Sequence, residues 1–244
     1  MLGTLSSGRP LESGRLPDAL PSPPPRHAVP VGVAMLAATV LIAVLLRDPR
    51  TSFVQHIDNS WAGWMPDSPD DWFTVLATVV EAGLGGPTGL IVPIALAGWL
   101  VIGRRWWSVL YVLTACVATD GLLIPLKDVV NRAHPDVPLM LASGGSFPSG
   151  HAFETAALVV VLGALVVRRA SRPRWWLIGA AVTAVVMWSG IQVHDSWLSD
   201  TVAGALAGAG TALLLWRAFA PLLRREARTA DEAGRAVRPV NVLE

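Results

Sequence analysis

The chain has 244 residues, of which 52% are hydrophobic and only 15% are charged, and its mean hydropathy is +0.50. These values exclude an ordinary water-soluble domain and indicate a polytopic membrane protein. The formal net charge is +1, and no basic stripe is interleaved with aromatic residues, which excludes a nucleic-acid-binding protein. Cys116 is the only cysteine, so no intrachain disulfide can form.

The N-terminal segment is rich in Pro, Ser and Arg and contains too few apolar residues to pack against a core. We expect residues 1–28 to form a disordered cytoplasmic tail. This segment does not resemble a signal peptide, because the apolar run that follows is long enough to span a bilayer and ends without a small-residue cleavage pattern. The membrane domain is therefore expected to begin at residue 29.

Apolar stretches long enough to approach the 20 or so residues needed to cross a bilayer follow in chain order. They cover about residues 29–46, 86–103, 106–126, 150–167, 175–193 and 197–216. Residues 70–83 are apolar at helical spacing between acidic ends, which is typical of a short interfacial helix. The sequence predicts an all-α, polytopic membrane helix bundle of about six transmembrane helices and one short interfacial helix. The membrane domain covers 29–220, and a basic cytoplasmic tail covers 221–244.

The basic residues are distributed unevenly between the two sides of this bundle. With six spans, 15 of the 19 lysines and arginines fall on the side that holds both termini, and four fall on the other side. By the positive-inside rule both termini are cytoplasmic, and the loops after the third and fifth spans are extracytoplasmic. We therefore expect an integral plasma-membrane protein whose chemistry faces away from the cytoplasm.

The two extracytoplasmic loops concentrate the polar side chains. The first holds Lys127, Arg132, His134 and the stretch GGSFPSGH, and the second holds His194, Asp195, Ser196 and Asp200. Cationic side chains, the hydroxyl of Ser149, and backbone N–H groups exposed by Gly150 at a helix N-terminus suit an anion. His151, in the first turn of that helix, is placed to donate a proton. No cluster with metal-ligand spacing stands out in the sequence.

Three blocks, KDVVNRAHP, FPSGH and SGIQVHDSWLSDTVAG, resemble in order and spacing the signature blocks of the type 2 phosphatidic acid phosphatase family. The resemblance covers about residues 70–215. It implies a six-helix membrane protein, similar in core to vanadium haloperoxidases, that removes phosphate from a lipid phosphate or isoprenyl diphosphate without a metal or other cofactor. It also implies that a third-block histidine attacks phosphorus, that an aspartate four residues later orients it, and that His151 protonates the leaving group.

The first block departs from the family pattern at one cationic position. Lys127 and Pro135 fit, but His134 stands where the family has arginine, and Arg132 matches a second arginine found in many members. The resemblance assigns the phosphate to Lys127, Arg132 and the Ser149–Gly150 turn, with His134 beside them.

The third block departs further. A gapless fit places Gly190 at the family's arginine, Ser196 at its nucleophilic histidine and Asp200 at its orienting aspartate. His194 replaces the missing histidine if the loop bends, because on a helix His194 and Asp200 would lie on different faces. Otherwise Asp195 orients His194, or Ser196 attacks with His194 as its base, since a free hydroxyl is a weak nucleophile.

Two functions follow. The first is a membrane hydrolase of phosphoric monoesters or diphosphates. The alternative is a catalytically inactive member that binds a lipid phosphate or scaffolds a membrane-protein partner. Gly204 and Gly208 form a small-xxx-small pattern that suits close helix packing, either within the monomer or across a homodimer.

Overall fold

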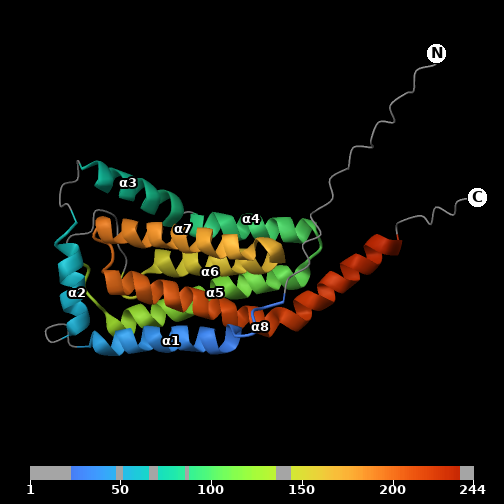
Figure 1. Ribbon diagram of the computed structural model, residues 1–244, viewed down its shortest axis with the longest axis horizontal. Helices are drawn as coiled ribbons and strands as arrows, with labels where there is room; N and C mark the ends of the chain where they lie inside the picture. Colours follow the sequence, from blue (N-terminus) through green and yellow to red (C-terminus); the bar gives the residue numbers. More distant parts are fainter. Residues whose placement is uncertain (1–22, 48–51, 66–70, 86–87, 136–143, 237–244) are drawn as a thin grey trace, which may run out of the picture.

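The computed structural model describes residues 23–47, 52–65, 71–85, 88–135 and 144–236, and the regular elements in these ranges are all helical (Figure 1). Most of the expected N-terminal tail lies outside the described residues. The helices are α1 (Ala28–Leu45), α2 (Phe53–Ala62), α3 (Trp72–Val80), α4 (Thr88–Ile102), α5 (Trp106–Val130), α6 (Gly150–Leu165), α7 (Arg172–Gln192) and α8 (Leu198–Ala236). A π-helical turn (Glu81–Gly85) follows α3, and a 3-10 turn (Arg169–Ser171) precedes α7. The predicted all-α helix bundle is confirmed.

Four helical segments are long and apolar enough to cross a membrane. They are Ala28–Leu45, Trp106–Val130, Arg169–Gln192 and Leu198–Glu232. Shorter apolar helices stand at Gly89–Ile102 and Gly150–Leu165, where the sequence predicts two further spans, and at Trp72–Gly83, where it predicts the interfacial helix. The total of six spans stays a prediction.

The last helix runs farther than the sequence analysis expects. α8 continues through Pro221 to Ala236, so residue 220 does not mark the end of an element. In this extension, Glu226 Oε2 accepts a hydrogen bond from the Ser108 backbone N–H (2.9 Å), and Glu226 Oε1 accepts one from Arg105 Nε (3.3 Å). A carboxylate at the start of α5 also interacts favourably with the helix dipole. The extension is thereby attached to the bundle.

The central packing contact joins α8 to α6. A Cβ added to Gly204 would lie 2.3 Å from the Ser149 carbonyl oxygen, and one added to Gly208 would lie 2.0 Å from that of Phe153. Only glycine allows the two backbones to approach this closely. Both glycines of the small-xxx-small pattern therefore pack within the chain.

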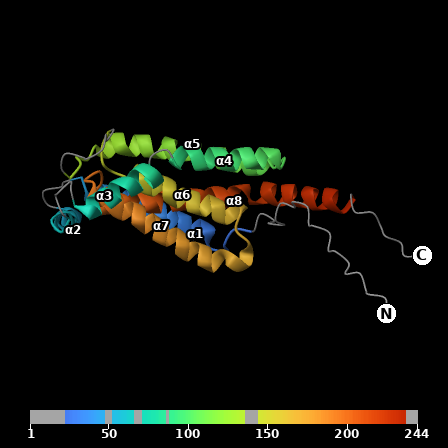
Figure 2. The same ribbon diagram turned by 90° about the horizontal axis from the view of Figure 1, so that it is seen from above.

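A short helix that the sequence analysis does not predict closes one end of the bundle. α2 lies across the end at which α5 and α7 terminate and α6 and α8 begin (Figures 1 and 2). It has ten residues and a mixed composition, so its hydropathy gives no spanning signal. Its one buried residue is Asp58. α2 thus adds a carboxylate to the end of the bundle where the predicted site residues gather.

Candidate functional site

The predicted site residues meet at this end, which we call the polar end and define by the last turn of α5, residues 131–135 and 144–149, the first turn of α6, and residues 193–200. Lys127 Nζ donates a hydrogen bond to the Gly145 carbonyl oxygen (2.6 Å). His134 bonds the Gly144 carbonyl oxygen through Nε2 (3.2 Å) and that of Asp195 through Nδ1. These contacts fix the glycine-rich loop. An ammonium has three donors, and within the described part of the chain Lys127 uses one of them, on Gly145.

The turn that opens α6 has the features of an anion cradle. Ser149 is the N-cap residue and is buried, and its backbone N–H donates to the Asp200 carbonyl oxygen (3.0 Å). A Cβ added to Gly150 would have no heavy atom within 4 Å, so the first residue of α6 faces open space. Backbone N–H groups at a helix N-terminus attract anions. The space beside Gly150 is therefore where an anion would lie against the start of α6.

Arg132 lies in a buried ion-pair network. Its Nη2 donates to Asp58 Oδ2 and to Gln55 Oε1, both at 2.6 Å. Its Nη1 donates to Ser199 Oγ (2.8 Å) and to Asp200 Oδ1. The Arg132, Asp58 and Asp200 side chains are 4%, 1% and 0% exposed. Charges buried this deeply require partners, and both terminal nitrogens of Arg132 are bonded to groups of the protein itself.

Asp200 connects the starts of two helices. Its second oxygen, Oδ2, accepts a hydrogen bond from the Trp197 backbone N–H (3.1 Å) at the start of α8, and its backbone carbonyl holds Ser149. Both carboxylate oxygens therefore serve ion pairing and helix capping. This is a different use from orienting a nucleophile, which the family resemblance implies for this position.

His151 has a carboxylate partner that the sequence analysis does not identify. Its Nδ1 bonds Glu81 Oε1, and Ser189 Oγ donates to Glu81 Oε2 (2.6 Å). The Glu81 side chain is 2% exposed, whereas the His151 side chain is 33% exposed. The imidazole is thus held from its buried side and open on the other.

Gly190 makes room for this pair. A Cβ at this position would lie 3.7 Å from Glu81 Oε1 and 4.0 Å from Ser196 Cβ. A longer side chain here would enter the space around the carboxylate. Where the family pattern has arginine, this chain therefore presents a bare backbone with the negative charge of Glu81 beside it.

The loop between α7 and α8 bends sharply. His194 is 8% exposed and has φ of 58°, in the left-handed region. The backbone N–H groups of Asp195 and Ser196 both donate to the Gly190 carbonyl oxygen, at 3.0 and 3.1 Å. Ser196 Oγ donates to Asp195 Oδ2 (3.2 Å). The loop thus folds back over the end of α7 and brings residues 194–196 beside Gly190.

Three of these side chains could hold a metal ion. Glu81, His151 and Asp195 each offer one ligand atom, and these atoms all lie within 4.8 Å of one another. No metal site is predicted from the sequence, because the three residues come from segments far apart in the chain and form no spacing motif. The sequence could still have suggested Glu81 as a site residue, because an ionisable side chain in an apolar helix is a candidate for function. No sequence feature suggested Asp58, because helix α2 was not predicted.

Part of the chain matches a known protein family. Residues 105–224 match the PAP2 superfamily. A transmembrane PAP2-type phosphatidylglycerolphosphate phosphatase from Bacillus subtilis has a similar structure, with a TM-score of 0.64 and 19% sequence identity over 86% of this chain and 98% of that chain. No curated protein matches the sequence. The family match and the shared fold of a transmembrane PAP2-type phosphatase together support membership of the PAP2 superfamily, in agreement with the resemblance seen in the sequence.

Proposed function

We propose that this protein is an integral membrane phosphohydrolase that removes phosphate from a lipid phosphate or an isoprenyl (di)phosphate. The observation that carries the proposal is the position of His151. It stands in the first turn of α6, one residue after Gly150, with Nδ1 bonded to a buried carboxylate and with the side chain 33% exposed.

In this mechanism His151 is the general acid. A carboxylate bonded to Nδ1 fixes the tautomer and ring orientation of an imidazole and stabilises its charged form. The proton on Nε2 can then pass to the oxygen of the leaving alcohol. The phosphate lies against Gly150 and Ser149, with Lys127 supplying charge, while Arg132 and His134 shape the site from behind it.

The attacking group comes from the bent loop. His194 attacks phosphorus directly, or His194 takes the proton of Ser196 and the serine attacks. Either route breaks the bond to the leaving alcohol and leaves the phosphoryl group on the attacking residue, and a water molecule then hydrolyses this intermediate to release inorganic phosphate. Ser196 has its hydroxyl bonded to Asp195, a contact that orients the oxygen. Asp200 then supports the reaction by fixing the start of α8, through its bonds to Arg132 and Trp197.

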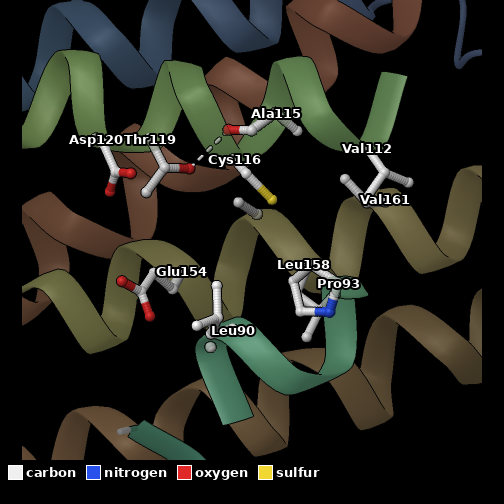
Figure 3. A pocket seen from close by; sticks show the side chains of 12 residues that line it. Leu90, Pro93, Val112, Ala115, Cys116, Thr119, Asp120, Glu154, Leu158 and Val161 are labelled. Atoms are coloured by element: carbon white, nitrogen blue, oxygen red, sulfur yellow. Dashed lines mark hydrogen bonds between the residues drawn. The ribbon is translucent and has the colours of Figure 1, made fainter. Parts of the chain in front are cut away.

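A pocket between α4, α5 and α6 offers a place for the lipid part of the substrate (Figure 3). Its walls are mainly apolar and include Leu90, Val112 and Leu158. Glu154 lines it three residues after His151, so the pocket begins one helical turn below the proposed acid. We place the substrate with its phosphate at the polar end and its chain in this pocket, on the extracytoplasmic side of the plasma membrane with both protein termini cytoplasmic.

A second function is favoured by one specific observation. The family resemblance assigns Arg132 to phosphate binding and Asp200 to orienting the nucleophile, but here these two side chains bond each other in the buried network. A member that binds a lipid phosphate without hydrolysing it, or that scaffolds a membrane partner, needs only the cradle and Lys127.

The two functions are separated by measuring phosphate release from lipid phosphates and isoprenyl diphosphates in detergent. Release by the parent protein that is lost in His151→Ala and retained in His56→Ala, an exposed histidine of α2, supports the hydrolase. Binding of lipid phosphate without release, weakened by Lys127→Ala, supports the binding protein. His194→Ala and Ser196→Ala then identify the attacking group.

A further inference from the structure

The two carboxylates next to His151 also suit a cation. Glu81 and Asp195 both place carboxylate oxygens beside the imidazole. The guanidinium of Arg132 is already shared between Asp58 and Asp200. The family's arginine is replaced by Gly190. Two carboxylates thus converge on one imidazole, an arrangement that a positive ion would complete.

We propose that Glu81, His151 and Asp195 bind one divalent transition-metal ion of the Zn²⁺ class. Imidazole nitrogen and carboxylate oxygen are both ligands of Zn²⁺, at about 2.0–2.2 Å from the ion. Ligand atoms around a tetrahedral ion at these distances lie roughly 3.3 Å apart. The three atoms here lie within 4.8 Å of one another, so binding requires the side chains to close by up to roughly 1.5 Å.

Hydroxyl groups already support both carboxylates from behind. Ser189 donates to Glu81 Oε2 at 2.6 Å, which leaves Oε1 toward the imidazole. Ser196 donates to Asp195 Oδ2 at 3.2 Å, which leaves Oδ1. Such outer contacts orient metal ligands and raise affinity. The site is open on the side of His151, and three protein ligands leave at least one coordination position for a small oxygen ligand.

Metal binding has a consequence that rests on the proposed function, although the binding itself does not. An ion held by the imidazole competes with Glu81 for the nitrogen that fixes the ring, and prevents His151 from passing a proton. The metal-bound protein should therefore release phosphate more slowly than the metal-free protein. The site would be a regulatory one, through which divalent ions inhibit the hydrolase.

The binding test uses the full chain in detergent, without a histidine tag, titrated calorimetrically with ZnCl₂ in the absence of lipid. We expect one ion per chain, with affinity lowered at least tenfold in Glu81→Gln, Asp195→Asn and His151→Ala. His56→Ala and Asp128→Asn, which alter an exposed histidine and an exposed acid elsewhere, should bind as the parent does. Co²⁺ in place of Zn²⁺ should give visible absorption bands that disappear in the same three variants.

Thermal unfolding of each variant identifies any that fail to fold, and the near-isosteric Glu81→Gln and Asp195→Asn then carry the test. No zinc binding, or binding unchanged in both of these variants, would overturn the site. The inhibitory role is overturned if chelation with EDTA abolishes phosphate release and Zn²⁺ restores it. Failure of the proposed function appears differently, as zinc binding without phosphate release under any condition.

Discussion

Replacing Arg132 with alanine should destabilise the fold more than it weakens phosphate binding. The substitution leaves the Asp58 and Asp200 carboxylates, 1% and 0% exposed, without their counter-ion. Removing one partner from a buried ion pair typically costs about 3–5 kcal/mol. Loss of hydrogen bonds to Gln55 and Ser199 acts in the same direction. For a chain of this size that corresponds to a fall in Tm of roughly 6–20 °C.

The assay is thermal unfolding in detergent, followed by tryptophan fluorescence, with Arg225→Ala as the matched control. Arg225 is exposed on α8, so its loss should change stability by no more than about 0.5 kcal/mol. Asp58→Asn added to Arg132→Ala should restore part of the lost stability, because it removes one of the stranded charges. If Arg132→Ala lowered stability by less than about 1 kcal/mol and instead abolished phosphate binding, Arg132 would be a phosphate ligand and the reasoning would be refuted.

Further predictions concern packing, positioning and capping. Gly208→Ala should lower the free energy of unfolding by about 1–3 kcal/mol, because the added Cβ would lie 2.0 Å from the Phe153 carbonyl oxygen. The control Gly98→Ala has open space around its Cβ and should not lower it. Equal stability of the two variants would mean that α6 and α8 do not pack so closely. Ser189→Ala should lower kcat for phosphate release roughly tenfold, because Glu81 loses a hydrogen bond to its charged group, and an unchanged kcat would argue against Glu81 as the positioning residue. Glu226→Gln should lower stability by about 0.3–1 kcal/mol through the α5 dipole, compared with no change for the exposed Glu232→Gln.

The helices were predictable from the sequence because hydropathy over a long window reports burial in a bilayer directly. α2 was not, since a ten-residue helix of mixed composition gains its stability from contacts, here those of Asp58 with the Ser199 backbone N–H at 2.9 Å and with Arg132. The end of α8 was not predictable either, because it also depends on contacts with the rest of the bundle. Charge along residues 221–236 suggests a solvated tail, whereas the Glu226 contact with Ser108 attaches this part to the bundle.

The site was predictable as a location and less so as a set of bonds. The PSGH block marks the start of α6, and the loop before α8 has a left-handed residue at His194. Pairing of charges could not be read from the sequence, because it depends on which segments meet. Arg132 pairs with Asp58, 74 residues away in the chain, and His151 bonds Glu81, 70 residues away. From the sequence, Gly190 shows only that the family's arginine is absent. The structure adds that Glu81 lies beside this position.

The most direct measurement is phosphate release from a panel of lipid phosphates and isoprenyl diphosphates, comparing the parent protein with Glu81→Gln, His151→Ala and His56→Ala. The hydrolase with a His151–Glu81 acid pair predicts release by the parent and by His56→Ala, none by His151→Ala, and a strongly reduced rate in Glu81→Gln. Release that persists undiminished in His151→Ala would contradict it.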